Sequence, residues 1–136
     1  MTATLLDTGV LVAMLDRDDP HHAAAKDLIG KDKGPLIVPS AVLPEVCYLA
    51  HKYLGPASEL AFTASLAKEE LPVDWAGPED LGRAAEIMKK RPDLGFVDAM
   101  VIAAAERLDV RRIGTLDRRN FGGFRPKHCQ AFELLP

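Results

Sequence analysis

A chain of 136 residues, 48% of them hydrophobic and 27% charged, has the size and composition of one globular domain spanning residues 1–136. Its net charge of −3, made of −7 over residues 1–88 and +4 over residues 89–136, excludes a nucleic-acid-binding role that depends on bulk positive charge alone. The sequence contains no apolar run near the roughly 20 residues that cross a bilayer and no secretory-signal pattern, so we expect a cytoplasmic protein without membrane contact.

The cysteines and histidines show no zinc-binding pattern. Cys47 and Cys129 lack the spacing of a disulfide framework or of a metal site, and the adjacent His21 and His22 project in different directions from a helix start. A candidate site must therefore be sought among the acidic residues.

The first predicted strand ends in an acidic residue. Leu5 and Leu6 form an apolar run typical of a strand that is covered on both faces of a parallel sheet, and a helix is predicted over residues 8–15. Asp7 therefore lies at the carboxyl end of a strand, where ligands bind in open α/β sheets, with the hydroxyl of Thr8 beside it. A helix-capping role for Asp7 or Thr8 is the alternative.

Helices and short strands then alternate along the chain. The predicted elements are helices over residues 21–30, 41–53, 57–68, 79–90 and from 96, and extended segments over residues 36–39, 71–75 and 131–135, with a further strand just before residue 117. Ser40 is the predicted N-cap of the helix over residues 41–53, and residues 118–121 are a predicted polar turn.

A second acidic residue lies on the apolar side of a predicted helix. Val42 and Leu49 are three residues before and four residues after Glu45, so the helix directs this carboxylate along its own apolar stripe. An ionised glutamate buried there needs a counter-charge or a metal ion, because burial of an unpaired charge costs several kcal/mol. The sequence leaves both possibilities open.

Two further acidic residues occupy comparable positions. Asp98 lies in the first turn of a helix that is apolar nearly all round until Glu106, which predicts burial, although a favourable interaction with the helix dipole would also explain an acid there. Asp117 follows a strand, as Asp7 does, although turn formation alone could account for it. Two acids at strand ends of one parallel sheet open onto the same edge.

This alternation of strands and helices predicts an α/β fold, an α/β/α sandwich with a mostly parallel central sheet. Four carboxylates that converge at one place repel one another and raise one another's pKa unless a cation binds them. Oxygen-only ligands favour Mg²⁺ or Mn²⁺ over zinc, and such ions commonly act on phosphates.

Together these segments resemble the PIN-domain family, in particular the VapC-like toxins of bacterial toxin–antitoxin pairs. The resemblance spans essentially the whole chain and depends on the joint order of its motifs: Leu-Leu-Asp7-Thr8, Glu45 in its helix, Phe96-Val97-Asp98-Ala99 and Thr115-Leu116-Asp117-Arg118-Arg119-Asn120-Phe121. It implies a PIN-like nuclease domain whose metal-binding and catalytic acids are Asp7, Glu45, Asp98 and Asp117, with Thr115 beside the site.

The resemblance implies an endoribonuclease that hydrolyses RNA phosphodiester bonds with a metal-activated water. Asp7 and Asp98 are the first candidates for direct metal ligands. The arginines Arg118, Arg119 and Arg125 are candidates for binding RNA phosphates. The implied partners are an RNA substrate, a cognate antitoxin that lies across the site, and a second copy of the chain in a homodimer.

One residue departs from the family pattern. Many members have another acid where this sequence has Asn120, and an amide oxygen can touch a metal or orient a water but carries no charge. We therefore expect one firmly bound Mg²⁺, and a second ion mainly when a substrate phosphate contributes ligands.

Two other functions fit parts of the pattern. A magnesium-dependent phosphatase of the haloacid-dehalogenase type also begins with an aspartate at a strand end, but it needs a second Asp at the position of Gly9. A degenerate PIN-like module that only binds protein or RNA is favoured by Asn120 and opposed by the four intact acids.

Overall fold

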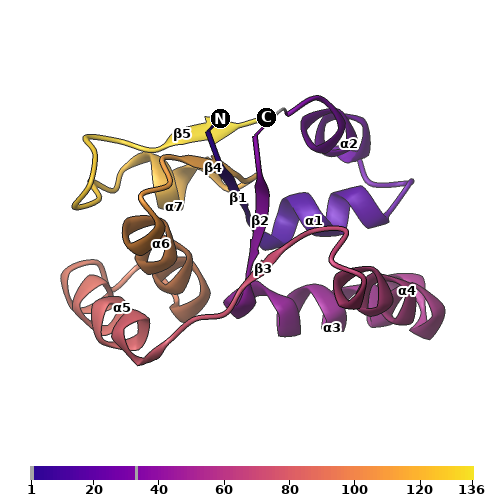
Figure 1. The fold of residues 1–136 in the computed structure, drawn as a ribbon, viewed down its shortest axis with the longest axis horizontal. Coiled ribbons are helices and arrows are strands. Elements are labelled where there is room, and N and C mark those ends of the chain that lie inside the picture. The colour runs from indigo at the N-terminus through magenta and orange to yellow at the C-terminus, as the bar shows by residue number, and fades with distance from the viewer. Residues whose placement is uncertain (1, 33) are drawn as a thin grey trace.

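Five short parallel strands form the central sheet in a computed structural model that describes residues 2–32 and 34–136 (Figure 1). In chain order they are β1 (Thr4–Leu6), β2 (Leu36–Pro39), β3 (Val73–Asp74), β4 (Arg112–Gly114) and β5 (Glu133–Leu135). Across the sheet the order is β3-β2-β1-β4-β5, and each neighbouring pair is parallel.

Helices connect the strands and cover both faces of the sheet. They are α1 (Thr8–Leu15), α2 (His22–Lys31), the 3₁₀ turn η1 (Ser40–Val42), α3 (Leu43–Leu54), α4 (Pro56–Ala67), α5 (Pro78–Lys90), α6 (Phe96–Leu108) and α7 (Arg118–Gly122). Figure 1 shows α1 to α4 on one side of the sheet and α5 and α6 on the other. The predicted α/β/α sandwich with a parallel sheet is confirmed.

The two most apolar segments of the sequence form the centre of the core. Leu5 and Leu6 of β1 have no exposed surface, and α6 is buried continuously from Ala99 to Ala105. Burial at this level stabilises the fold by about 25 cal/mol for each Å² of apolar surface removed from water. The structure therefore places Asp7, which follows β1, and Asp98, in the first turn of α6, next to the most deeply buried segments of the molecule.

The strand order reverses between β1 and β4, and this reversal places the candidate site. Leu6 is in register with Gly114, and the backbone N–H of Asp7 donates to the carbonyl oxygen of Gly114 at 2.8 Å. A Cβ atom at position 114 would lie 3.1 Å from the side chains of both Leu6 and Leu28, so the close packing here favours glycine. In doubly wound sheets, ligands bind at such a reversal, outside the carboxyl ends of the strands.

Two local predictions differ from the structure. Ser40 does not cap the following helix: it begins η1, α3 starts only at Leu43, and the Ser40 hydroxyl accepts the backbone N–H of Ala76 at 3.0 Å. The hydroxyl is thus used to join two parts of the chain that are remote in sequence. The predicted polar turn after Asp117 is the short helix α7.

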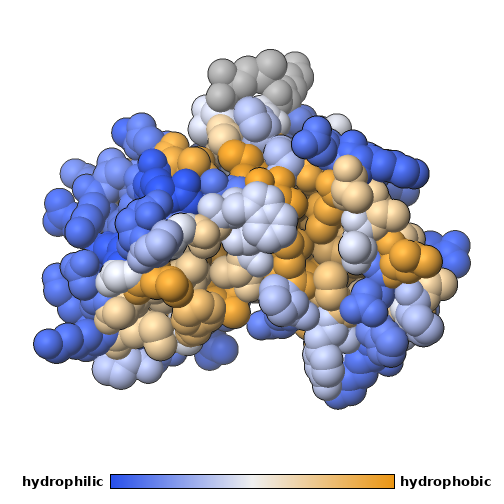
Figure 2. All heavy atoms as spheres, turned by 60° about the horizontal axis from the view of Figure 1, so that its bottom comes forward, coloured by the Kyte–Doolittle hydropathy of each residue, from blue (hydrophilic) through white to orange (hydrophobic). Residues whose placement is uncertain are grey.

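Apolar residues are also exposed on the surface. Figure 2 shows apolar side chains in the middle of one face, between hydrophilic edges. The large hydrophobic side chains that remain exposed in the described ranges are Tyr48, Tyr53, Leu60, Trp75, Leu81 and Phe96. Within the described ranges, no helix is both long enough and apolar enough to cross a membrane.

Candidate active site

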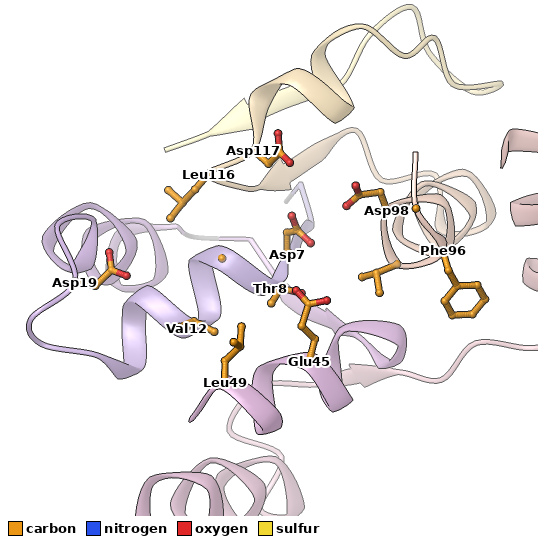
Figure 3. Close-up of a pocket in the computed structure, with 13 residues that line it drawn as sticks. Asp7, Thr8, Val12, Asp19, Glu45, Leu49, Phe96, Asp98, Leu116 and Asp117 are labelled. Carbon is orange, nitrogen blue, oxygen red and sulfur yellow. The ribbon is translucent and has the colours of Figure 1, made fainter. Parts of the chain in front are cut away.

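A pocket of about 620 Å³ opens where the strand order reverses, and all four predicted acids line it (Figure 3). Asp7 follows β1, Asp117 follows β4, Glu45 is in the first turn of α3 and Asp98 is in the first turn of α6. Figure 3 shows their carboxylates directed toward a common space. The fold thus brings together residues that are up to 110 positions apart in the sequence.

Asp7 is the most buried of the acids, with only 6% of its surface exposed. The hydroxyl of Thr115 donates to its Oδ2 at 3.0 Å. Burial raises the pKa of Asp7 to about 6, and the negative charges of Asp98 and Glu45 add to this rise. Hydrogen bonds from the Thr8 backbone and from Thr115 oppose it. The shift is therefore mainly an effect of burial, and the two nearby carboxylates add a smaller contribution.

Thr115 joins the two acids at the strand ends. Besides donating to Asp7, its Oγ1 accepts the backbone N–H of Asp117 at 3.0 Å. Thr115 is itself buried, so both hydrogen bonds are shielded from water. The predicted position of this hydroxyl beside the site agrees with the structure.

Asn120 links the other pair of acids. Its Nδ2 donates to Oδ2 of Asp98 at 2.6 Å and to Oδ2 of Asp117 at 2.9 Å. Burial raises the pKa of Asp98, the charges of Asp117 and Glu45 raise it further, and the hydrogen bond from Asn120 opposes the rise. The amide of Asn120 therefore partly offsets the repulsion between two carboxylates.

The expected burial of Glu45 is wrong. Val46, the next residue, is fully buried, but Glu45 is exposed and its carboxylate projects into the open pocket (Figure 3). Because α3 begins at Leu43 and not at residue 41, Glu45 falls in its first turn, at the mouth of the pocket. Leu49, one turn further, does line the pocket as the apolar stripe predicted.

No basic side chain in residues 2–32 and 34–136 forms an ion pair with any of the four acids. Other buried acids are paired, as Asp80 is with Arg107 at 2.9 Å and Glu106 with Arg83 at 2.6 Å. The possibility of a structural counter-charge for Glu45 therefore finds no support in the described parts of the chain.

The chemistry of this pocket fits a hard divalent cation. The side-chain groups in its lining that could ligate a metal are mainly carboxylate oxygens. The buried Thr8 Oγ1 beside Asp7 has no hydrogen-bond partner within the described segments. As the side chains stand, no three acidic, His or Cys side chains among the described residues are close enough together to hold a metal ion. The acids must therefore turn inward to bind one, and oxygen-only ligands favour Mg²⁺ or Mn²⁺.

The three candidate RNA-binding arginines lie outside the pocket lining. Arg118 is directed toward the end of the chain, where its guanidinium donates to the carbonyl oxygens of Leu134 and Pro136. Arg119 and Arg125 are exposed. Their role in RNA binding stays a prediction.

Asp19 and Phe96 are among the pocket residues that were not identified from the sequence as site residues. Asp19, in the turn between α1 and α2, lines the far end of the pocket, where its Oδ1 accepts the backbone N–H of His21 at 2.7 Å. Phe96 lies at the pocket rim and is half exposed. A signal for Phe96 was present, because an aromatic residue two positions before Asp98 starts a helix whose remaining apolar residues are buried.

Comparisons with known proteins agree with this geometry. Residues 4–124 match the PIN domain family model. Ribonuclease VapC26 of Mycobacterium tuberculosis is 34% identical over 134 residues, which cover 97% of this chain and 99% of that protein.

Solved structures share the fold. The Mycobacterium tuberculosis VapC20, a sarcin-ricin loop cleaving toxin, superposes with a TM-score of 0.80 at 20% identity, over 89% of this chain and 95% of that one. The VapBC2 complex of Rickettsia felis, bound to a promoter DNA fragment, gives a TM-score of 0.72 at 15% identity, over 99% and 100% of the two chains. From the acids gathered at the sheet reversal and from these matches over nearly its full length, the chain belongs to the PIN-domain family.

Proposed function

We propose that this chain is a metal-dependent endoribonuclease toxin that hydrolyses RNA phosphodiester bonds and is held inactive by a cognate antitoxin. The observation that carries the proposal is the convergence on one pocket of four carboxylates, associated with four separate elements, none of which forms an ion pair within the described residues. The identity of 34% with a ribonuclease over nearly the whole chain supports the same reaction class.

In this proposal, Asp7 and Asp98 hold Mg²⁺ or Mn²⁺ directly, and Glu45 and Asp117 contribute directly or through water. The ion would lower the pKa of a bound water and neutralise charge on the phosphate. A carboxylate that does not bind the ion orients the attacking water and accepts its proton. Thr115 keeps the Asp7 carboxylate oriented by its hydrogen bond at 3.0 Å, and Asn120 does so for Asp98 and Asp117.

The proposed partners are an RNA substrate, an antitoxin and a second copy of the chain. Solved structures with the same fold include toxin–antitoxin assemblies, among them a complex from Klebsiella pneumoniae with a TM-score of 0.70. An antitoxin segment that covers the pocket would block both the carboxylates and the access of RNA. Inhibition of this kind blocks access to the pocket and does not require the active-site residues to move.

The activity test compares three proteins purified in parallel. The unchanged chain is expected to cleave single-stranded and structured RNA with Mg²⁺ or Mn²⁺ and to lose cleavage in EDTA. Asp98→Asn is expected to lower the rate at least 100-fold, because one metal ligand loses its charge. Asp109→Asn, an exposed position at the end of the same helix, is the matched control and is expected to keep full activity.

Equal cleavage by all three proteins would indicate a contaminating nuclease and contradict the proposal. RNA binding without cleavage under any metal condition would instead favour a PIN-like binding module. Growth arrest on expression, relieved by Asp98→Asn and by co-expression of a neighbouring small gene, would support the toxin and antitoxin roles.

A further inference from the structure

Among the described residues, the lining of the candidate active site offers no basic side chain that could attract RNA. Five carboxylates line the pocket, those of Asp7, Asp19, Glu45, Asp98 and Asp117, and none of its lining residues in the described ranges is Lys, Arg or His. A bound divalent ion would neutralise only part of this charge. Besides the contact of the scissile phosphate with such an ion, contacts that do not depend on phosphate charge would add to the binding energy of RNA at this site.

Phe96 is the residue in the pocket lining that offers such a contact. Half of its surface is exposed, and it is the one large exposed hydrophobic side chain of the described segments that lines this pocket. Figure 3 shows its ring at the rim, on the opposite side of Asp98 from Asp7 and turned away from the carboxylates. Phe96 belongs neither to the core cluster nor to the partly buried side chains packed against it, and its exposed half is accessible to a ligand.

The backbone also holds this ring in a fixed relation to the acids. Phe96 is the first residue of α6, Asp98 is the third, and the helix is fully buried a few residues later. The aromatic side chain is therefore carried by a rigid element and not by a mobile loop. A nucleotide next to the one whose phosphate lies among the carboxylates would reach this rim.

We propose that Phe96 is a positioning residue that stacks on one nucleobase adjacent to the scissile phosphate, an inference that rests on the function proposed above. Stacking of bases on aromatic side chains is a common way in which proteins bind unpaired RNA, and the stacking contact itself does not require a positive charge. The substrate class is thus RNA with an unstacked base beside the cleavage site, either in a loop or in a single strand.

Three variants separate aromatic stacking from simple apolar contact. Phe96→Leu keeps an apolar side chain but removes the aromatic face, and Phe96→Trp enlarges that face. We expect Phe96→Leu to raise KM for a single-stranded RNA about tenfold with kcat changed less than twofold, and Phe96→Trp to keep or lower KM. Tyr53→Leu, at an exposed aromatic residue outside the pocket lining, is the control and should leave KM unchanged.

Two further measurements test the contact directly. Because stacking releases no counterions, the dependence of KM on salt should be the same in Phe96→Leu and in the unchanged chain. In EDTA, single-stranded RNAs with 2-aminopurine at each position in turn should show quenching at one position with the unchanged chain, and none there with Phe96→Leu.

Several results would overturn the inference. These are an unchanged KM in Phe96→Leu, an equal effect of Tyr53→Leu, a reduced salt dependence in Phe96→Leu, or a loss of antitoxin affinity without any change in cleavage. If the unchanged chain neither cleaves nor binds RNA, the proposed function fails; if it cleaves RNA and Phe96→Leu cleaves equally well, only the stacking contact fails.

Discussion

Asp7 has a carboxyl group whose protonation is coupled to folding. Its pKa is raised from 3.8 to about 6 in the folded chain, mainly by burial, so the folded state binds a proton more tightly than the unfolded state does. Between these two pH values, the contribution of Asp7 to stability falls as the pH rises. The raised pKa of Asp98 acts in the same direction.

This coupling gives a test in the metal-free protein. In EDTA, we expect the contribution of Asp7 to the free energy of unfolding to fall by about 2.4 kcal/mol from pH 4 to pH 7, since one pKa unit corresponds to about 1.4 kcal/mol. Asp7→Asn should remove most of this dependence and stabilise the protein at pH 7. Urea unfolding at a series of pH values measures both effects, and identical pH profiles for the two proteins would contradict the assignment.

We predict that Asn120 affects both the stability of the chain and its proposed metal binding. Its side chain donates to Asp98 and Asp117, whereas an aspartate there could only accept hydrogen bonds. We expect Asn120→Asp to lower the metal-free stability by about 1–2 kcal/mol and to tighten Mn²⁺ binding several-fold.

Calorimetric titration with Mn²⁺ and urea unfolding in EDTA measure the two effects of Asn120→Asp. Asn120→Ala serves as the comparison, because it removes the amide without adding charge and should weaken stability without tightening metal binding. Tighter binding in both variants would mean that the added carboxylate is not the cause.

At the scale of the elements, an ion-pair network fixes α6 against its neighbours. Arg107, in the last turn of α6, donates to the carboxylate of Asp80 on α5 at 2.9 Å and to that of Asp74 on β3. Asp80 is almost fully buried, so its charge depends on this partner. The network lies at the opposite end of α6 from Asp98.

Removal of the guanidinium should therefore affect stability and not chemistry. We expect Arg107→Met to destabilise the protein by about 3 kcal/mol, because it leaves the Asp80 carboxylate buried without a partner. Addition of Asp80→Asn should recover part of the loss. Thermal and urea unfolding measure these changes, while kcat at a temperature well below unfolding should stay within twofold. A large fall in kcat would show that the network also aligns the active site.

At the scale of the whole molecule, the strand-end acids were predictable because parallel strands end at one sheet edge. The apolar run before Asp7 and the predicted strand before Asp117 were sufficient to place both at that edge, and the apolar length of α6 was sufficient to predict its burial. The exposure of Glu45 was not predictable, because it depends on the start of α3 at Leu43, which a tertiary contact between Ser40 and Ala76 accompanies. Position along an apolar stripe does not reveal whether a helix end faces a cavity.

The uneven charge of the chain bears on how RNA approaches the acidic pocket. Residues 89–136, which carry a net charge of +4, include Arg119 and Arg125, which are exposed. They also include Arg118, whose guanidinium donates to the backbone at the end of β5. Each phosphate contact contributes about 0.7 to the magnitude of the slope of log affinity against log salt concentration for single strands.

We expect Arg119→Ala and Arg125→Ala each to reduce the magnitude of this slope by about that amount. Arg118→Ala should mainly lower the unfolding temperature, because the hydrogen bonds from its guanidinium to the backbone are lost. Lys26→Ala, an exposed change on α2, is the control. Fluorescence anisotropy of labelled RNA in EDTA over a range of salt concentrations gives the slopes. Unchanged slopes in Arg119→Ala and Arg125→Ala would place the phosphate contacts elsewhere on the molecule.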